Sequence, residues 1–206
     1  MVEIRKEITF LCGIRGPLLL LIASALLQLF YTGSQDWVFF DRAALGEGQW
    51  WRLLSGHLVH TNAMHLLLNG GAVAALWLLH GQFYRVPVYL GLVALLSLVI
   101  SLGLWAWFPD VALYGGLSGV LHGLFCWGAC RDMAQRRLSG ALLLAGCWGK
   151  VAWELFAGPS AATAELIEAE VAVSSHLLGA LAGSAIGLMS WVAQLELGGR
   201  RRAISP

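Results

Sequence analysis

One apolar segment of the chain opens with Gly115-Gly116-Leu117-Ser118-Gly119-Val120-Leu121-His122-Gly123. The stretch places a single hydroxyl, that of Ser118, among glycines at a depth where polar groups are costly. A second apolar segment, also striped with glycine, holds His176. A serine and a histidine on two membrane helices suggest a nucleophile and its base, because a serine hydroxyl reacts only when a neighbouring base activates it.

The composition indicates an all-α integral membrane protein. Of 206 residues, 58% are hydrophobic and only 12% are charged, whereas soluble domains carry about 25% charged residues. A membrane-spanning helix needs roughly 20 apolar residues, so the length suits six spans without a separate soluble domain. We predict one domain over residues 1–206, with spans at 17–33, 61–79, 86–107, 115–130, 138–156 and 171–195 and an interfacial loop at 34–60.

The basic residues sort to one side of this six-helix bundle. One side collects ten of the 13 basic residues, and the other holds Arg42 and Arg52 together with seven acids. The ten are Arg5, Lys6, Arg15, Arg85, Arg131, Arg136, Arg137, Arg200, Arg201 and Arg202. Because cytoplasmic loops are enriched in Lys and Arg, both termini are predicted to be cytoplasmic.

Glycines recur every four residues on the two segments that hold Ser118 and His176. They are Gly115, Gly119 and Gly123 on the first, and Gly179, Gly183 and Gly187 on the second. Such stripes let two helix backbones approach closely, which brings the hydroxyl and the imidazole together. The alternative is that the stripes serve packing alone and that Ser118 bonds to its own helix.

Two further polar residues share one face of the second span. His65 and Asn69 are four residues apart, so they project from the same side of a helix. An imidazole and a carboxamide there suit an oxyanion pocket, with the Ser118 backbone N–H at a helix N-terminus as a further donor. The alternative role for this pair is hydrogen bonding between helices.

From spacing alone, His122 competes with His176 as the base, since it follows Ser118 by four residues. It lies one turn deeper in the membrane, which favours His176 and leaves His122 as a packing or supporting donor. No acid is positioned as an obvious third member, so the spacing favours a Ser–His dyad.

Lys150 and Glu154 are charged residues inside the fifth predicted span. They are four residues apart and can pair. Breaking a buried pair leaves an uncompensated charge at a cost of roughly 3–5 kcal/mol. The pair is interpreted either as an internal ion pair facing another helix or as a candidate substrate gate.

These residues resemble the motifs of the rhomboid intramembrane serine proteases. Gly116-Leu117-Ser118-Gly119 looks like the family motif G-x-S-G at the start of the fourth helix. Two further motifs are similar: W-R…H-x-x-x-x-H-x-x-x-N in Trp51, Arg52, His60, His65 and Asn69, and H-x-x-G in His176 and Gly179. Together they extend from the first loop into the sixth span.

The resemblance implies a six-transmembrane-helix rhomboid-like bundle and a Ser118–His176 dyad in which Ser118 attacks a peptide carbonyl. It implies an oxyanion site made by His65, Asn69 and the Ser118 N–H. The family needs no metal or cofactor for this reaction. Because the fifth helix of rhomboids borders the lateral route of the substrate, Lys150 and Glu154 are expected near that route.

The resemblance also assigns structural roles. Trp51 and Arg52 belong to the interfacial first loop, and His60 is mainly structural there. Two positions depart from the general pattern: Ser175 stands where the family often has alanine, and His122 is not part of the pattern. Neither departure removes a catalytic group.

The compact form and the stretch Gly-Leu-Ser-Gly-Val-Leu-His-Gly look most like the rhombosortase branch of bacterial rhomboids. That resemblance implies transmembrane substrates with a C-terminal Gly-Gly, a hydrophobic helix and a basic tail. It implies a multi-pass protein of the bacterial inner membrane, surrounded by lipid, whose active site opens to the periplasm. No nucleic-acid partner is expected.

Two other functions compete with proteolysis. A catalytically inactive rhomboid-like protein binds transmembrane helices, but such relatives usually lack the serine or the histidine. A small transporter or channel uses intramembrane histidines as a proton relay. The inverted repeats typical of transporters are not evident in the sequence.

Overall fold

The computed structural model describes the backbone of residues 11–30 and 37–204, and the side chains of 11–29 and 37–196. Six long helices dominate this part of the chain: α2 (Arg15–Phe30), α5 (Ala63–His80), α6 (Val86–Trp107), α7 (Ser118–Ala134), α8 (Leu138–Ala157) and α10 (Val173–Ile204). Shorter elements connect them: β1 (Phe40–Asp41), α3 (Arg42–Gly46), α4 (Arg52–Ser55), η2 (Gly81–Phe83), β2 (Leu113–Tyr114) and α9 (Ala161–Ile167). The expected end of the first span, at residue 33, lies outside the described residues.

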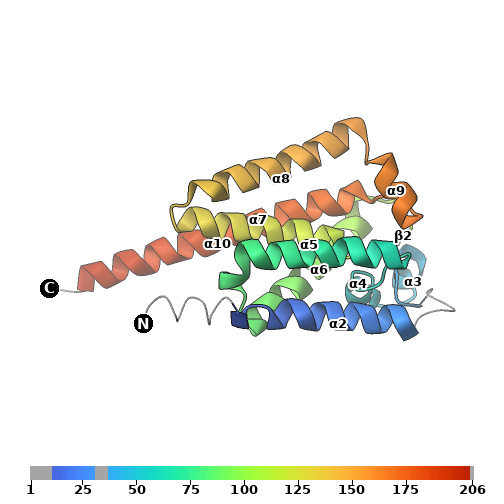
Figure 1. Ribbon diagram of the computed structural model, residues 1–206, viewed down its shortest axis with the longest axis horizontal. Helices are drawn as coiled ribbons and strands as arrows, with labels where there is room; N and C mark the ends of the chain where they lie inside the picture. Colours follow the sequence, from blue (N-terminus) through green and yellow to red (C-terminus); the bar gives the residue numbers. More distant parts are fainter. Residues whose placement is uncertain (1–10, 31–36, 205–206) are drawn as a thin grey trace.

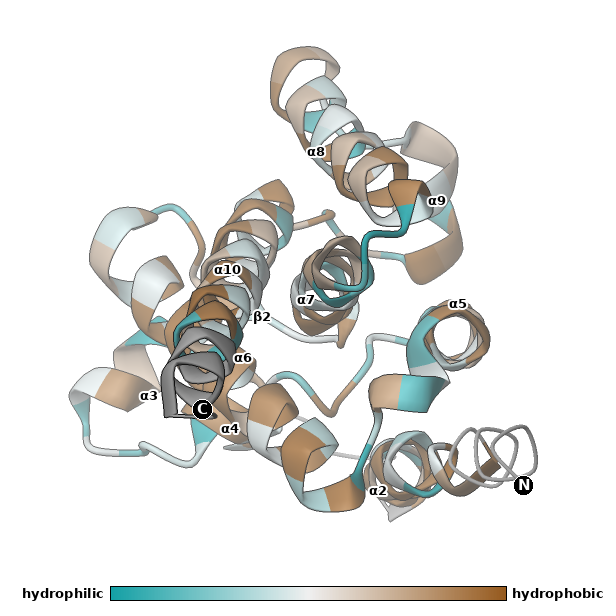
Figure 2. Cartoon of the chain, turned by 90° about the vertical axis from the view of Figure 1, so that its left-hand side faces the viewer, coloured by the Kyte–Doolittle hydropathy of each residue, from teal (hydrophilic) through white to brown (hydrophobic). Residues whose placement is uncertain are grey.

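Helix α7 lies at the centre of the bundle and packs against α5, α6, α8 and α10 (Figures 1 and 2). Most of its residues are buried, including Val120, Leu124 and Ala129, whose side chains have no exposed surface. Helix α8 lies at the edge of the bundle and buries only Gly140, Cys147 and Val151. The serine helix is therefore enclosed, whereas the helix with Lys150 and Glu154 is peripheral.

Among the residues that the structure describes, three helices are long and apolar enough to cross a membrane: Ala63–Phe83, Val86–Trp107 and Val173–Glu196. Arg15–Leu29 is a shorter apolar helix. Helix α8, which contains the charged residues Lys150 and Glu154, is not among these three. The chain is thus a helical membrane protein, and the number of six spans stays a prediction.

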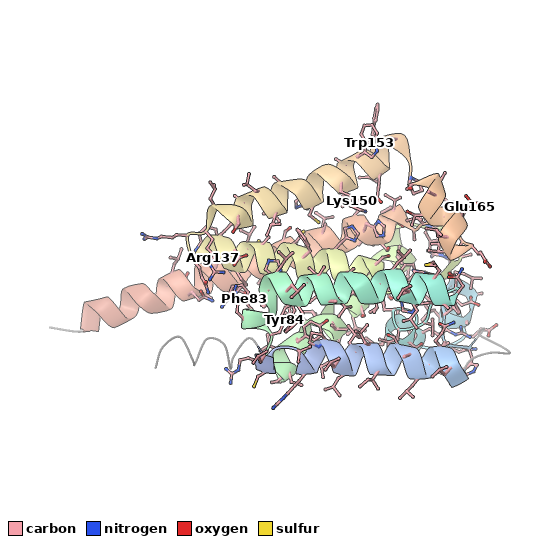
Figure 3. The ribbon with its side chains drawn as sticks, viewed as in Figure 1. Phe83, Tyr84, Arg137, Lys150, Trp153 and Glu165 are labelled. Atoms are coloured by element: carbon pink, nitrogen blue, oxygen red, sulfur yellow. The ribbon has the colours of Figure 1, made fainter. Side chains whose placement is uncertain are left out.

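The two ends of the bundle differ in charge. The start of α2 and the end of α10 lie at the same end (Figure 1). Arg137 lies at that end, and Glu165 of α9 lies at the opposite one (Figure 3). This separation follows the sorting of charges along the sequence.

The first loop is tied to the segment that precedes α7. Strands β1 and β2 pair antiparallel, with Phe40 opposite Tyr114. The Arg42 guanidinium donates to three carbonyls at the C-terminal end of α6, those of Leu104, Trp105 and Phe108, at 2.7, 2.8 and 2.6 Å. These links set the position at which α7 begins.

Helix α7 begins at Ser118, three residues later than the sequence predicts. Gly116 has φ +119°, a conformation outside the helical range that L side chains avoid. Its N–H donates to the carbonyl of Gly56 in the first loop at 3.0 Å, and its carbonyl accepts from the Tyr114 hydroxyl at 2.7 Å. Because these contacts hold Gly116 outside the helix, Ser118 is the first helical residue and does not lie one turn inside.

Candidate active site

Ser118 and His176 meet between α7 and α10. The Ser118 Oγ lies 3.0 Å from His176 Nε2, which is within the range of a nucleophile–base hydrogen bond. His176 is buried and Ser118 is partly exposed. The hydroxyl is therefore accessible while the imidazole is enclosed.

Two pairs of glycines bring these helices together. Gly179 packs on the Gly119 carbonyl, and Gly183 packs on the Gly123 carbonyl, with no room for a methyl group at either place. This close packing is the one that the glycine stripes predict. The outermost glycine of each stripe does not pair with a glycine of the other helix. Gly115 lies against the Phe39 ring, and Gly187 packs against Cys130.

The N-terminus of α7 points its backbone at the site. The first four N–H groups of a helix have no partner within the helix, and the helix dipole makes this end partly positive. Ser118 is the first residue of α7. Its own N–H and Oγ are thus suited to act on the same carbonyl group.

His65 and Asn69 lie beside Gly116 at the same end of α7. A Cβ on Gly116 would be 2.6 Å from His65 Nε2 and 3.6 Å from Asn69 Nδ2. The Asn69 Nδ2 is buried and has no hydrogen-bond partner within the described part of the chain. An unpaired buried donor costs free energy, so this nitrogen beside Gly116 is a candidate donor to a bound ligand.

Thr61 holds the His65 ring in place through Nδ1. This nitrogen lies 3.0 Å from Thr61 Oγ1, a hydroxyl that also contacts the Ile167 carbonyl at 2.6 Å. The same nitrogen also accepts from the Thr61 backbone N–H at 3.5 Å. When Nδ1 accepts, the proton of the neutral ring is on Nε2, which faces Gly116. His65 Nε2 and Asn69 Nδ2 are therefore both candidate donors at this end of α7.

His122 is directed away from the nucleophile. Its Nδ1 lies 2.7 Å from the Ser118 carbonyl oxygen and donates to it, while its Nε2 lies 3.2 Å from Lys150 Nζ. Its ring stacks on His176 with centroids 4.2 Å apart. Both ring nitrogens of His122 have hydrogen-bond partners, so His122 contacts the Ser118 backbone through Nδ1 and the His176 ring through stacking.

Glu154 accompanies the histidine, which sequence spacing did not indicate. Its Oε2 lies 2.9 Å from His176 Nδ1, and its Oε1 lies 2.7 Å from Lys150 Nζ. The expected Lys150–Glu154 pair is thus present. The expectation that no acid is positioned as a third member is wrong, because packing of α8 brings a residue from another helix to His176.

The first-loop residues act through the backbone of that loop. The buried Arg52 donates to the Phe39 carbonyl and to Gln49 Oε1, both at 2.8 Å. Trp51 is exposed and donates to the Trp37 carbonyl at 2.8 Å. These three bonds close the loop on itself, away from Ser118.

His57 and His60 are fully buried in the first loop. Burial lowers the pKa of His57 to about 4. Burial, together with the neighbouring His65, lowers the pKa of His60 to about 3. Both rings are therefore neutral near pH 7, and His60 packs edge-on against His65 with centroids 4.9 Å apart.

A cavity of about 470 Å³ opens at Ser118. Its walls include His65, Thr61, Tyr114 and Ile167. Thr61 and Tyr114 have no counterpart among the sequence-predicted site residues, although Tyr114 directly precedes the glycine stretch. Its hydroxyl, bonded to Gly116, shapes the turn that presents the serine.

A second, more apolar cavity of about 340 Å³ lies between α5 and α8 over α7. Leu76 and Leu79 of α5, Phe125 of α7, and His122 and Lys150 line it. Figure 3 shows Trp153 of α8 pointing away from the bundle, while Lys150 lies on the side that faces it. Two of its lining residues, His122 and Lys150, also contact His176 and Glu154, respectively.

His122, Glu154 and His176 also bring three metal-ligand atoms within 4.8 Å of one another. Lys150 places its ammonium 2.7 Å from the carboxylate and 3.2 Å from His122 Nε2. A positive charge thus already lies against two of the three ligands and opposes a metal ion there.

Comparison with known protein families matches residues 47–192 to the Rhomboid domain. The match covers more than half of the chain, and this chain belongs to the rhomboid family. The family consists in general of intramembrane serine proteases that act on transmembrane proteins. No curated protein matches the sequence.

Proposed function

We propose that this chain is an active intramembrane serine protease with Ser118 as nucleophile and His176 as base. The observation that carries the proposal is the 3.0 Å contact between Ser118 Oγ and His176 Nε2 at the wall of a cavity. Family membership supports the class of reaction.

In the first step, His176 Nε2 takes the Ser118 proton as Oγ attacks the peptide carbonyl. The negative charge that develops on the carbonyl oxygen is stabilised by the Ser118 N–H and by Asn69 Nδ2. His65 is held by Thr61 through Nδ1, and its Nε2, which faces Gly116, adds a further donor when it carries the proton. Removal of one such donor costs about 10²–10³ in kcat in other serine proteases.

In the second step, His176 gives the proton to the leaving amine, and the C-terminal piece of the substrate departs. Water, or another amine, then attacks the acyl-enzyme while His176 again accepts a proton. Every proton transfer and every oxyanion contact in these two steps uses a side chain or a backbone N–H of this chain.

The apolar groove between α5 and α8 is the proposed route of the substrate helix to the site. Its walls are aliphatic and aromatic, which suits a transmembrane segment. Of the two gate candidates, Lys150 lines this groove and Glu154 contacts His176. If Lys150→Met combined with Glu154→Leu leaves cleavage of a native substrate unchanged, neither residue serves the route or the site.

We further propose a rhombosortase with six spans, both termini in the cytoplasm and the site open to the periplasm of a bacterial inner membrane. The motif around Ser118 and His122 supports the subfamily. The basic and acidic ends of the bundle support the orientation (Figure 3). The substrates are then proteins with a C-terminal Gly-Gly, a hydrophobic helix and a basic tail.

The test uses purified full-length protein in detergent with a fluorophosphonate probe and a Gly-Gly-tailed transmembrane substrate. We expect labelling and cleavage by the wild type and by Ser190→Ala, a serine on α10 bonded to its own helix, and neither by Ser118→Ala. Labelling that persists in Ser118→Ala overturns the nucleophile. Absence of both activities in the wild type favours the inactive, helix-binding alternative. Cleavage of transmembrane substrates without preference for Gly-Gly removes the subfamily proposal only.

A further inference from the structure

We propose that Glu154 is the positioning residue of His176, so that the site works as a Ser118–His176–Glu154 triad built from three helices. This inference rests on the proposed proteolytic function. It adds to the expected dyad an acid that the fifth long helix, α8, contributes.

The contacts of Glu154 divide its carboxylate between two partners. Oε2 lies 2.9 Å from His176 Nδ1, and Oε1 lies 2.7 Å from Lys150 Nζ. The Glu154 side chain is only 12% exposed, and that of His176 is 6% exposed. A charge-assisted hydrogen bond in such an enclosed place restricts the ring strongly.

The position of Glu154 on α8 argues against a role confined to the ion pair. Gly140, Cys147 and Val151 form the buried stripe of this helix, and residue 154 continues it at helical spacing. An apolar side chain is expected at such a place. Lys150 lies beside the stripe with 52% of its side chain exposed. A carboxylate that served only as its ion-pair partner could also lie at the surface, away from His176.

The hydrogen bonds around His176 select one tautomer. A carboxylate only accepts, so Nδ1 carries the proton and Nε2 presents its lone pair to Ser118. This is the form in which the ring takes the serine proton. The neighbouring His122 donates from Nδ1 to the Ser118 carbonyl and accepts from Lys150 at Nε2, so it does not compete for the carboxylate.

The role of Glu154 in the reaction is electrostatic and geometric. When the Ser118 proton moves to Nε2, the ring becomes an imidazolium that donates from Nδ1 to Glu154. The carboxylate stabilises that charge and keeps its own protonation state unchanged. The proton on Nε2 then goes to the leaving amine, and the ring returns to its starting tautomer.

The test compares Glu154→Gln with Lys150→Gln in the full-length protein. Glutamine retains the size of the side chain but loses the charge. Its amide N–H can also donate to an unprotonated His176 Nδ1, which favours the Nε2–H tautomer that cannot accept the serine proton. We expect Glu154→Gln to lose at least about tenfold in kcat with KM within about threefold, and Lys150→Gln to lose less. A smaller loss in Glu154→Gln, or an equal loss in Lys150→Gln, overturns the proposal in favour of a structural ion pair.

A second measurement leaves Glu154 unchanged. In ¹⁵N-histidine-labelled wild-type protein, the nitrogen resonances of His176 report which ring nitrogen carries the proton, with His176→Ala providing the assignment. We expect the Nδ1–H tautomer, and the Nε2–H tautomer in the resting enzyme overturns the proposal. Thermal unfolding in detergent shows whether each variant is folded. If Glu154→Gln is unfolded, the NMR measurement on the wild type decides whether the proposal holds.

The two proposals fail in different ways. Activity that survives Ser118→Ala removes the proposed protease mechanism as a whole. Activity that requires Ser118 but tolerates Glu154→Gln removes only the third residue.

Discussion

The backbone of Gly179 on α10 rests on the carbonyl oxygen of Gly119 on α7, without space for a methyl group between them. Gly119 directly follows Ser118, and Gly179 lies about one turn after His176. It sets the separation of the two helices and thereby the 3.0 Å distance between nucleophile and base. The glycines are therefore part of the geometry of the reaction as well as of the fold.

Gly179→Ala is expected to force α7 and α10 apart. Overpacking of this kind costs typically 1–3 kcal/mol, and a displacement of about 1 Å at a catalytic pair can cost about 10²-fold in rate. We expect at least a tenfold loss of kcat/KM and a lower unfolding temperature in detergent. The matched control is Gly91→Ala on α6, where no atom lies within 4 Å of the new methyl group. Wild-type activity in Gly179→Ala would contradict the role of this contact.

Gly116→Ala is expected to damage the site more than the fold. The residue has φ +119°, and its new Cβ would lie 2.6 Å from His65 Nε2, so the imidazole must shift. Backbone strain at such a position costs roughly 1–3 kcal/mol. Gly158→Ala carries comparable strain at φ +82° with no atom within 4 Å.

The comparison of these two variants separates strain from site geometry. We expect similar decreases in unfolding temperature but a loss of fluorophosphonate labelling rate in Gly116→Ala alone. An equal loss of labelling in both variants would show that stability alone governs activity here.

Asn69→Ala tests the unpaired donor beside Ser118. Because Asn69 Nδ2 has no partner in the described structure, its removal breaks no hydrogen bond of that nitrogen. We expect kcat to fall by about 10²–10³ with little change in KM. Asn62→Ala should show the opposite pattern: it removes the N-cap of α5, costing about 1 kcal/mol of stability, while most of kcat remains. A kcat in Asn69→Ala within threefold of wild type would exclude this residue from the oxyanion site.

The buried histidines of the first loop make stability depend on pH. The pKa of His57 is lowered to about 4 and that of His60 to about 3, both mainly by burial, from about 6.5 in the unfolded chain. Between pH 6.5 and 4 the unfolded state binds more protons, so the free energy of unfolding decreases as the pH falls. We expect the unfolding temperature in detergent to drop across this window, and less steeply in a His57→Gln/His60→Gln double variant. A wild-type unfolding temperature that stays constant from pH 7 to 4.5 contradicts this prediction.

Much of the architecture follows from local patterns. Apolar runs indicate a helical membrane protein, and the glycine stripes indicate which two helices touch. Those features depend on near neighbours in the chain and on the cost of polar groups in lipid. Helix α7 begins later than the apolar run predicts, because Gly116 is held outside the helix by the Gly56 carbonyl of the first loop and by the Tyr114 hydroxyl at the end of β2.

Composition and spacing within single helices indicate a helical membrane protein and its candidate residues: a serine and a histidine on glycine-striped helices, and an imidazole and an amide on a third. The surroundings of His176, in contrast, depend on tertiary packing. This packing turns His122 toward the Ser118 carbonyl and brings Glu154 from the peripheral helix α8 to within 2.9 Å of the imidazole. The physical reason is that i, i+4 spacing identifies neighbours on one helix, whereas the meeting of α7, α8 and α10 depends on how their faces pack.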